Sequence, residues 1–171
     1  MEERTGIITM KGNPLTLIGK QLKIGESVPD CEVMSNDLSP VRLSSFQGKV
    51  CVIATVPSLD TPVCDMETRR FNEDVGMLGP DVTMLVISMD LPFAQKRWCD
   101  AAGVDKVITL SDYLRASFGE AYGVLIKELR LLARAVFVLD RDGVLQYVQL
   151  VKEVADEPDY NEVLGAVKKL L

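Results

Sequence analysis

The chain has 171 residues, 47% of them hydrophobic and 26% charged, a length and balance that fit one globular domain over residues 1–171. Its net charge of −6 argues against nucleic acid as a partner, because phosphate binding relies on clustered lysine and arginine. No apolar run approaches the roughly 20 residues of a membrane helix, and no apolar signal segment follows the acidic N-terminus, so we expect no membrane contact and a cytoplasmic protein.

The sequence predicts several short strands in the N-terminal part of the chain. Residues 6–10 and 15–18 are β-like runs separated by the turn cluster Lys11-Gly12-Asn13-Pro14, so residues 1–20 are predicted to form a β-hairpin extension. Two further short strands are expected at 31–34 and 41–43. One capped helical turn over 44–49 then leads into the next strand.

The middle of the chain alternates strands and helices. The apolar runs 50–56 and 82–88 predict buried strands, and the residues between them in the chain predict a helix over 65–75. Strand, crossover helix and strand form a βαβ unit, so these two strands should be parallel neighbours. A second helix of roughly ten residues is bracketed by Pro92 and Gly103.

The C-terminal part completes the predicted sheet. After a short strand at 107–110 and a helical segment over 112–118, strands at 133–139 and 144–151 are joined by Asp140-Arg141-Asp142-Gly143, a strong hairpin turn. An amphipathic helix over 159–171 ends the chain. The pattern predicts an α/β protein with a thioredoxin-like fold: a mixed central sheet flanked by helices, preceded by the β-hairpin extension.

Cys64 occupies a chemically distinctive position in this pattern. It comes after a strand and a proline-containing loop, where a helix begins. Unpaired N–H groups and the helix dipole favour an anion there, and cysteines at such sites have thiol pKa values as low as roughly 3.5–7.5. The carboxylates of Asp60, Asp65 and Glu67 oppose a thiolate. A reactive Cys64 therefore requires an arginine or lysine from elsewhere in the fold.

The histidine and cysteine content excludes several types of catalytic and metal site. The chain has no histidine, which excludes Ser-His-Asp and Cys-His catalysis and imidazole metal sites. Its four cysteines include no C-x-x-C pair, and in a reducing compartment they do not form a structural disulfide framework. Cys51 is expected to be a small core residue. The same is expected of Cys31, although a strand edge could expose it. At most one pair of the cysteines works as a transient redox couple.

Several segments together resemble one family. The spacing Pro57…Thr61…Cys64 is similar to the Pro-x-x-x-Thr-x-x-Cys active-site motif of the peroxiredoxins. The surrounding residues resemble the thiol peroxidase branch, an atypical two-cysteine class. The likeness lies in residues 58–64 with 68–72, in residues 90–99 around Cys99, and in residues 132–140 around Arg134. The resemblance covers essentially the whole chain.

The resemblance implies a thiol-dependent peroxidase. Cys64 would attack a hydroperoxide and become a sulfenic acid, while Thr61 and Arg134 stabilise the charge and Pro57 shapes and shields the site. Cys99 would then form an intramolecular disulfide with Cys64, which a thioredoxin-like dithiol reduces. No metal, haem or flavin is expected. The family also implies small and alkyl hydroperoxides as substrates, and a homodimer.

One physical constraint bears on the second step. A disulfide needs Cα atoms roughly 4.4–6.8 Å apart, whereas Cys64 begins one helix and Cys99 lies inside another. We therefore expect the 93–102 helix to unwind locally before the disulfide forms.

Other interpretations remain open at this stage. Cys64 could be a buried or N-capping residue with no reactivity. Cys99 could be a packing residue, with an external thiol resolving the sulfenic acid, and Arg134 could belong to a structural salt bridge. The chain could also be a non-catalytic thioredoxin-fold peroxide sensor, which would form the disulfide without turnover. A thiol–disulfide oxidoreductase is disfavoured because the usual vicinal dithiol is missing.

Overall fold

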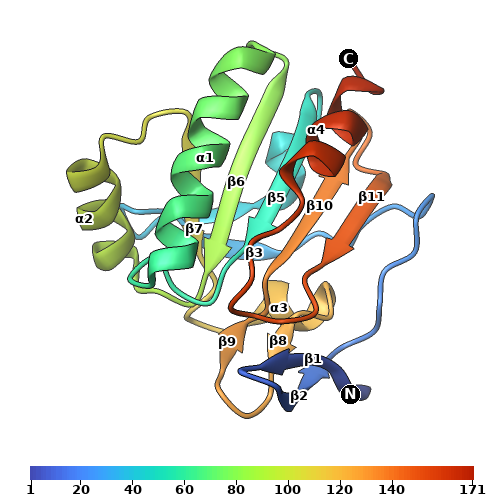
Figure 1. Cartoon of the computed structure of the whole chain (residues 1–171). Helices are drawn as coiled ribbons and strands as arrows, with labels where there is room; N and C mark the ends of the chain where they lie inside the picture. The colour runs from blue at the N-terminus through green and yellow to red at the C-terminus, as the bar shows by residue number, and fades with distance from the viewer.

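The computed structural model describes all residues from 1 to 171. A seven-stranded mixed sheet forms its centre, with strands in the order β11-β10-β5-β6-β7-β3-β4 (Figure 1). The strands of this sheet span β3 Glu32–Met34, β4 Pro40–Arg42, β5 Val50–Thr55, β6 Val82–Ser88, β7 Val107–Ser111, β10 Ala135–Leu139 and β11 Leu145–Leu150. None of the helices combines the length and apolar character that crossing a membrane would need.

Two parallel crossovers build the middle of the sheet, as predicted. Strands β5 and β6 pair in parallel through α1 (Pro62–Leu78), and β6 and β7 pair in parallel through α2 (Pro92–Ala102). All six residues of β5 are buried, which explains its continuous apolar sequence. The α2 helix has Pro92 in its first turn and a left-handed Gly103 as its C-cap.

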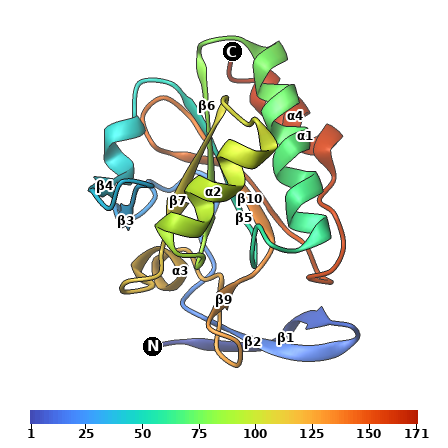
Figure 2. The ribbon, with the colours of Figure 1, turned by 90° about the vertical axis from the view of Figure 1, so that its left-hand side faces the viewer.

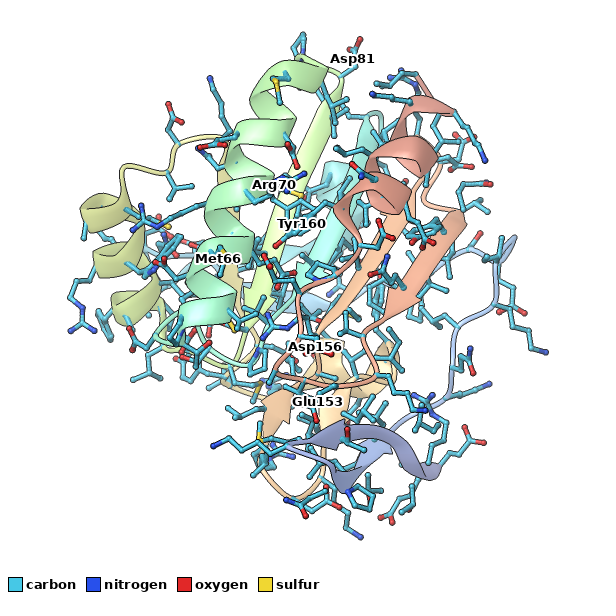
Figure 3. The ribbon with its side chains drawn as sticks, viewed as in Figure 1. Met66, Arg70, Asp81, Glu153, Asp156 and Tyr160 are labelled. Atoms are coloured by element: carbon cyan, nitrogen blue, oxygen red, sulfur yellow. The ribbon has the colours of Figure 1, made fainter.

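Helices α1 and α4 (Tyr160–Lys168) cover one face of the sheet (Figure 1). Phe71 from α1 and Val163 and Val167 from α4 belong to the same buried apolar cluster. Tyr160 joins the two helices, since its ring packs edge-on against Phe71 and lies under Arg70, whose guanidinium carbon is 4.4 Å from the ring centroid (Figure 3).

The N-terminal hairpin belongs to a second, smaller sheet. The predicted strands are β1 (Glu3–Met10) and β2 (Asn13–Ile18). β2 pairs antiparallel with β8 (Leu125–Ile126), which pairs in turn with β9 (Leu131–Leu132). The two-residue strands β8 and β9 have no sequence signal of their own, because they are shorter than any detectable periodicity. Figure 2 shows this sheet across the lower end of the molecule.

Three local predictions need correction. The helix expected over 112–118 is α3, Ser117–Ala121, because the buried carboxylate of Asp112 accepts the N–H groups of Phe118 and Gly119 and so holds the helix start further along the chain. The helical turn expected over 44–49 is a 3₁₀ turn over 43–46, called η1. Arg134 lies between β9 and β10, just before the strand that was expected to contain it.

Candidate active site

Cys64 lies in the first turn of α1, two residues after the helix begins at Pro62. The chain leaves β5, turns through residues 56–61, and reaches Thr61, an N-cap residue with extended backbone and no side-chain capping bond. The Cys64 side chain is fully buried, with 0% of the residue exposed. The thiol therefore belongs to the N-terminal turn of a helix, where unpaired N–H groups and the helix dipole favour an anion. Its burial removes it from bulk water, so it needs a cation beside it to stabilise a negative charge.

Arg134 provides the positive charge at this thiol. Its Nη2 atom donates to Cys64 Sγ at 3.4 Å, its Nη1 atom to Glu67 Oε2 at 2.5 Å, and its Nε atom to the Val154 carbonyl at 3.0 Å. Only 2% of Arg134 is exposed. Each of the three guanidinium nitrogens thus donates to a different partner, which fixes the orientation of the planar group, and one of these partners is the Cys64 sulfur.

Glu67 is one of the carboxylates expected to oppose a thiolate, and the structure pairs it with Arg134. It lies one helical turn after Cys64 and is 0% exposed. Burial raises the pKa of Glu67 to about 7, although Arg134 favours its charged form. Burial of Arg134 lowers the pKa of that guanidinium, but Glu67 and Cys64 together outweigh this effect and raise it. Arg134 is therefore the cation that pairs with Glu67 as well as with Cys64. The spacing of three residues between Cys64 and Glu67 was the sequence feature that could have indicated this shared partner.

The loop before Cys64 is held by its own hydrogen bonds. Pro57 is buried at the start of the loop. The Thr61 hydroxyl donates to the Ser58 carbonyl at 2.9 Å, and this bond leaves its oxygen free to accept another. The structure brings Thr61 into the same turn as Cys64 but gives it no hydrogen bond to the sulfur.

Asp90 anchors this loop from the end of β6. Its carboxylate accepts the Ser58 hydroxyl at 2.7 Å, the Leu59 N–H at 2.8 Å and the Ser88 hydroxyl at 2.8 Å. The sequence placed Asp90 before a helix and in a segment of family resemblance, but it did not indicate these hydrogen-bond partners, which are 31 and 32 residues away along the chain. Asp90 therefore holds the active-site loop in place without touching the thiol.

Cys99 is not brought to Cys64. It lies in the last turns of α2, half-buried, with Sγ 3.4 Å from Thr109 Oγ1 on β7. Burial raises the pKa of the Cys99 thiol. All four cysteines are free thiols, and α2 is intact around Cys99. The two sulfurs thus have separate partners in this state.

Cys31 and Cys51 lie in the core on the other face of the sheet. They are 5% and 4% exposed, and both belong to a different apolar cluster from Cys64. Burial raises the pKa of each thiol to about 12. Both are therefore core residues with little thiolate character, as the sequence indicated.

The fold and this site define a class of protein. A buried cysteine in the first turn of a crossover helix, facing an arginine just before a strand of a mixed sheet, is the arrangement of a thiol-based redox protein, and residues 23–164 match the Redoxin family. The chain is 53% identical over 164 residues to a thiol peroxidase of Bacillus subtilis (strain 168), covering 96% of this chain and 98% of that protein. It is 54% identical over 162 residues to a thiol peroxidase of Oceanobacillus iheyensis, covering 95% and 98%. The chain belongs to the thiol peroxidase family of the peroxiredoxins.

Solved structures agree with the predicted fold. A peroxiredoxin-like protein from Aquifex aeolicus superposes with a TM-score of 0.91 at 46% identity, covering 98% of both chains. A thiol peroxidase from Chromobacterium violaceum superposes with a TM-score of 0.86, covering 95% of both chains, and at 20% identity it supports the fold alone. The thioredoxin-like α/β fold with an N-terminal hairpin is confirmed.

Proposed function

We propose that this chain reduces hydroperoxides to water or alcohols, with Cys64 as the attacking thiolate. The observation that carries the proposal is the 3.4 Å contact from Arg134 Nη2 to Cys64 Sγ within a buried first turn of a helix. The identity of over 50% to thiol peroxidases supports the same activity. A cation and a helix N-terminus together favour the thiolate, which is the nucleophilic form of cysteine.

In the first step the thiolate attacks the terminal oxygen of the hydroperoxide. A sulfur–oxygen bond forms, the oxygen–oxygen bond breaks, and the leaving oxygen takes up a proton to become water or an alcohol. Negative charge moves from the sulfur towards the leaving oxygen. Arg134 stabilises this charge, Thr61 offers a hydroxyl that can turn towards the peroxide, and Pro57 shapes and shields the loop.

In the second step the sulfenic acid of Cys64 condenses with the thiol of Cys99. A sulfur–sulfur bond forms, the sulfur–oxygen bond breaks, and water leaves with the Cys99 proton. A thioredoxin-like dithiol then reduces the disulfide and is itself oxidised. Because Cys99 contacts Thr109 in an intact helix, the second half of α2 has to open before the sulfurs meet.

Two further properties complete the proposal. The four free cysteines fit a reducing compartment such as the cytoplasm, where a dithiol reductant is available. A homodimer, the assembly implied by the family resemblance, has an apolar surface available at the start of α2, where Leu91 and Phe93 are 51% and 66% exposed.

The test is peroxide-dependent turnover with thioredoxin, its reductase and NADPH, comparing the native chain with Cys64→Ser and Cys99→Ser. Cys64→Ser should abolish turnover. Cys99→Ser should consume one equivalent of peroxide and then stop, because the sulfenic acid forms but is not resolved. Full activity in Cys64→Ser would refute the proposal. A native protein that forms the disulfide but does not turn over would instead be the peroxide sensor.

A further inference from the structure

Helix α2 is weakly attached to the rest of the molecule. Only Pro92 and Gln95 of its eleven residues are buried, and both lie in its first half. The second half, residues 96–102, contains Cys99 and has no buried residue. Trp98 is half-buried and packs against the buried apolar cluster that contains Phe71, whereas its neighbours in this half bury little apolar surface. The contacts of Trp98 and of a few other residues therefore decide how often this half opens.

The first half of α2 is anchored by polar contacts. Gln95 Nε2 donates to Ser88 Oγ at 3.0 Å and to the Leu110 carbonyl at 2.8 Å. Asp90, two residues before the helix, holds the active-site loop through Ser58. Opening is therefore confined to the second half of the helix.

The second half of α2 is fastened to α1 by a cluster of three side chains, Asp65, Arg69 and Trp98, here called the α1–α2 latch. Trp98 Nε1 donates to Asp65 Oδ1 at 2.8 Å. Arg69 Nε contacts the other carboxylate oxygen, Oδ2, at 3.0 Å, and the Arg69 guanidinium carbon lies 5.7 Å from the centroid of the Trp98 ring.

The latch also reaches the end of the helix. Arg69 Nη1 donates to the carbonyl of Ala102, the last residue of α2, at 3.3 Å. Figures 1 and 2 show α2 beside the lower half of α1, from two directions. The latch therefore joins the residue that follows Cys64 to the residue that precedes Cys99.

We propose that the α1–α2 latch sets the rate at which Cys99 resolves the sulfenic acid of Cys64, with Trp98 and Arg69 as positioning residues. The inference rests on the proposed function. Trp98 and Ala102 flank Cys99 within one helical turn, so the turn cannot unwind while both are held by α1. The latch keeps the helix closed during peroxide attack and has to break before the disulfide forms.

The strength of the latch also decides whether the Cys64 sulfenic acid is oxidised further or forms the disulfide with Cys99. While the helix is closed, the Cys64 sulfenic acid can react with a second hydroperoxide, whose terminal oxygen is transferred to sulfur to give a sulfinic acid and water or an alcohol. When the helix opens, Cys99 attacks the sulfenic sulfur, the disulfide forms and water leaves. A weaker latch therefore favours the disulfide over the sulfinic acid.

The test uses Trp98→Phe, which keeps an aromatic ring but removes the N–H donor. The full chain is mixed rapidly with peroxide, quenched with a thiol-blocking reagent, and analysed by mass spectrometry for sulfenic acid, disulfide and sulfinic acid. Disulfide formation should be about three- to tenfold faster, the factor for one partly exposed hydrogen bond. The rate of peroxide attack should be unchanged, and more peroxide should be needed to produce the sulfinic acid.

Lys96→Gln is the matched control. It removes the Lys96–Asp100 ion pair of 3.1 Å, which lies within the same half of α2 and does not touch α1. Lys96→Gln should leave disulfide formation nearly unchanged. Equal acceleration in Lys96→Gln would overturn the latch, because general loosening of the helix would then be sufficient.

Arg69→Gln provides the second test, since Trp98→Phe removes the only tryptophan. It breaks the contacts to Asp65 and Ala102 and should also accelerate resolution, now followed by Trp98 fluorescence. An unchanged disulfide rate in both variants would overturn the proposal. If the native chain consumes peroxide but forms no Cys64–Cys99 disulfide, the second step of the proposed function fails instead, and the variants then have no resolution rate to change.

Discussion

Arg134 is the residue on which we expect the chemistry of Cys64 to depend most. Its three nitrogens point to three partners, Cys64, Glu67 and Val154. Arg134→Met should slow the reaction with hydrogen peroxide at least about a hundredfold, because removing one preorganised donor from a buried site has an effect of that size. Arg134→Lys should remain clearly impaired, since one ammonium group cannot reproduce the guanidinium fork. Stopped-flow kinetics of peroxide consumption measures both.

The control for Arg134 is Arg141→Met, which removes an exposed arginine from the turn between β10 and β11. It should leave the rate of peroxide attack unchanged. A native rate in Arg134→Met would show that the helix N-terminus alone activates the thiol.

Glu67 should give the protein a pH-dependent stability. Burial raises its folded-state pKa from the ordinary value of 4.5 to about 7. The folded chain binds this proton more tightly than the unfolded chain, so the stabilising contribution is present below about pH 4.5 and is lost as the pH rises towards 7. Denaturant unfolding should therefore show the native chain losing on the order of 3 kcal/mol between these pH values relative to Glu67→Gln. Glu73→Gln, an exposed change on the same helix, should behave like the native chain.

At the scale of elements, Asp90 couples the start of α2 to the loop before Cys64. Asp90→Asn keeps the shape of the side chain but replaces one acceptor oxygen with a donor, so the Ser58 hydroxyl, the Leu59 N–H and the Ser88 hydroxyl can no longer all be accepted. Peroxide attack should slow by roughly tenfold, because the loop loses its position relative to the helix start. Faster amide exchange at Leu59 would accompany the slower rate.

Asp100→Asn is the control for Asp90, since Asp100 is an exposed aspartate on α2 whose ion pair with Lys96 stays within the helix. Equal slowing in both variants would contradict a specific role for Asp90.

The elements predicted correctly are those with a strong local signal. Strands β5 and β6 are continuous apolar runs buried in the sheet, and α2 is bracketed by a proline and a glycine that suit its two ends. Strands β8 and β9 are two residues each and exist because β2 offers an edge to pair with. The start of α3 depends on the capping carboxylate of Asp112. Such features follow from tertiary contacts, which a local pattern does not contain.

The residues of the candidate active site also divide into those that local sequence could locate and those that it could not. Cys64 could be located from the sequence because its position at the start of a helix is local information. The need for a cation could also be argued from charge, but the choice of Arg134 came from family resemblance, because 70 residues separate it from Cys64. Asp90 and the α1–α2 latch were missed, since each joins segments that are more than 30 residues apart.

At the scale of the whole molecule, the N-terminal hairpin is connected to the active site. Thr9 N donates to the Lys152 carbonyl at 2.8 Å, and Val154 N donates to the Thr9 carbonyl at 2.9 Å. The Val154 carbonyl in turn accepts Arg134 Nε. Strand β1 therefore supports the segment that orients Arg134, and we expect the hairpin to influence peroxide attack through this connection.

Glu153 is the side chain that fixes this connection, and Figure 3 shows it in the loop beside the hairpin. Its Oε1 atom accepts the Thr9 hydroxyl and the Gly12 N–H, both at 3.0 Å, and its Oε2 atom accepts the Ala155 N–H at 3.0 Å. The backbone N–H groups of Ala155 and Gly12 lower the pKa of Glu153 to about 2. The carboxylate form is thus favoured in the folded chain.

Glu153→Gln should weaken the support of Arg134 and slow peroxide attack by roughly two- to tenfold, because Arg134 loses its fixed direction while keeping its charge. The stability that Glu153 contributes is present above about pH 4.5 and is lost as the pH falls towards 2, since its folded-state pKa is depressed. The native chain should therefore exceed Glu153→Gln in unfolding free energy near neutral pH, with the difference closing in acid. Glu3→Gln, which breaks only the exposed Glu3–Lys127 pair of the same hairpin, should leave the peroxide rate at the native value. If Glu153→Gln attacked peroxide at the native rate, the hairpin would have a structural role only.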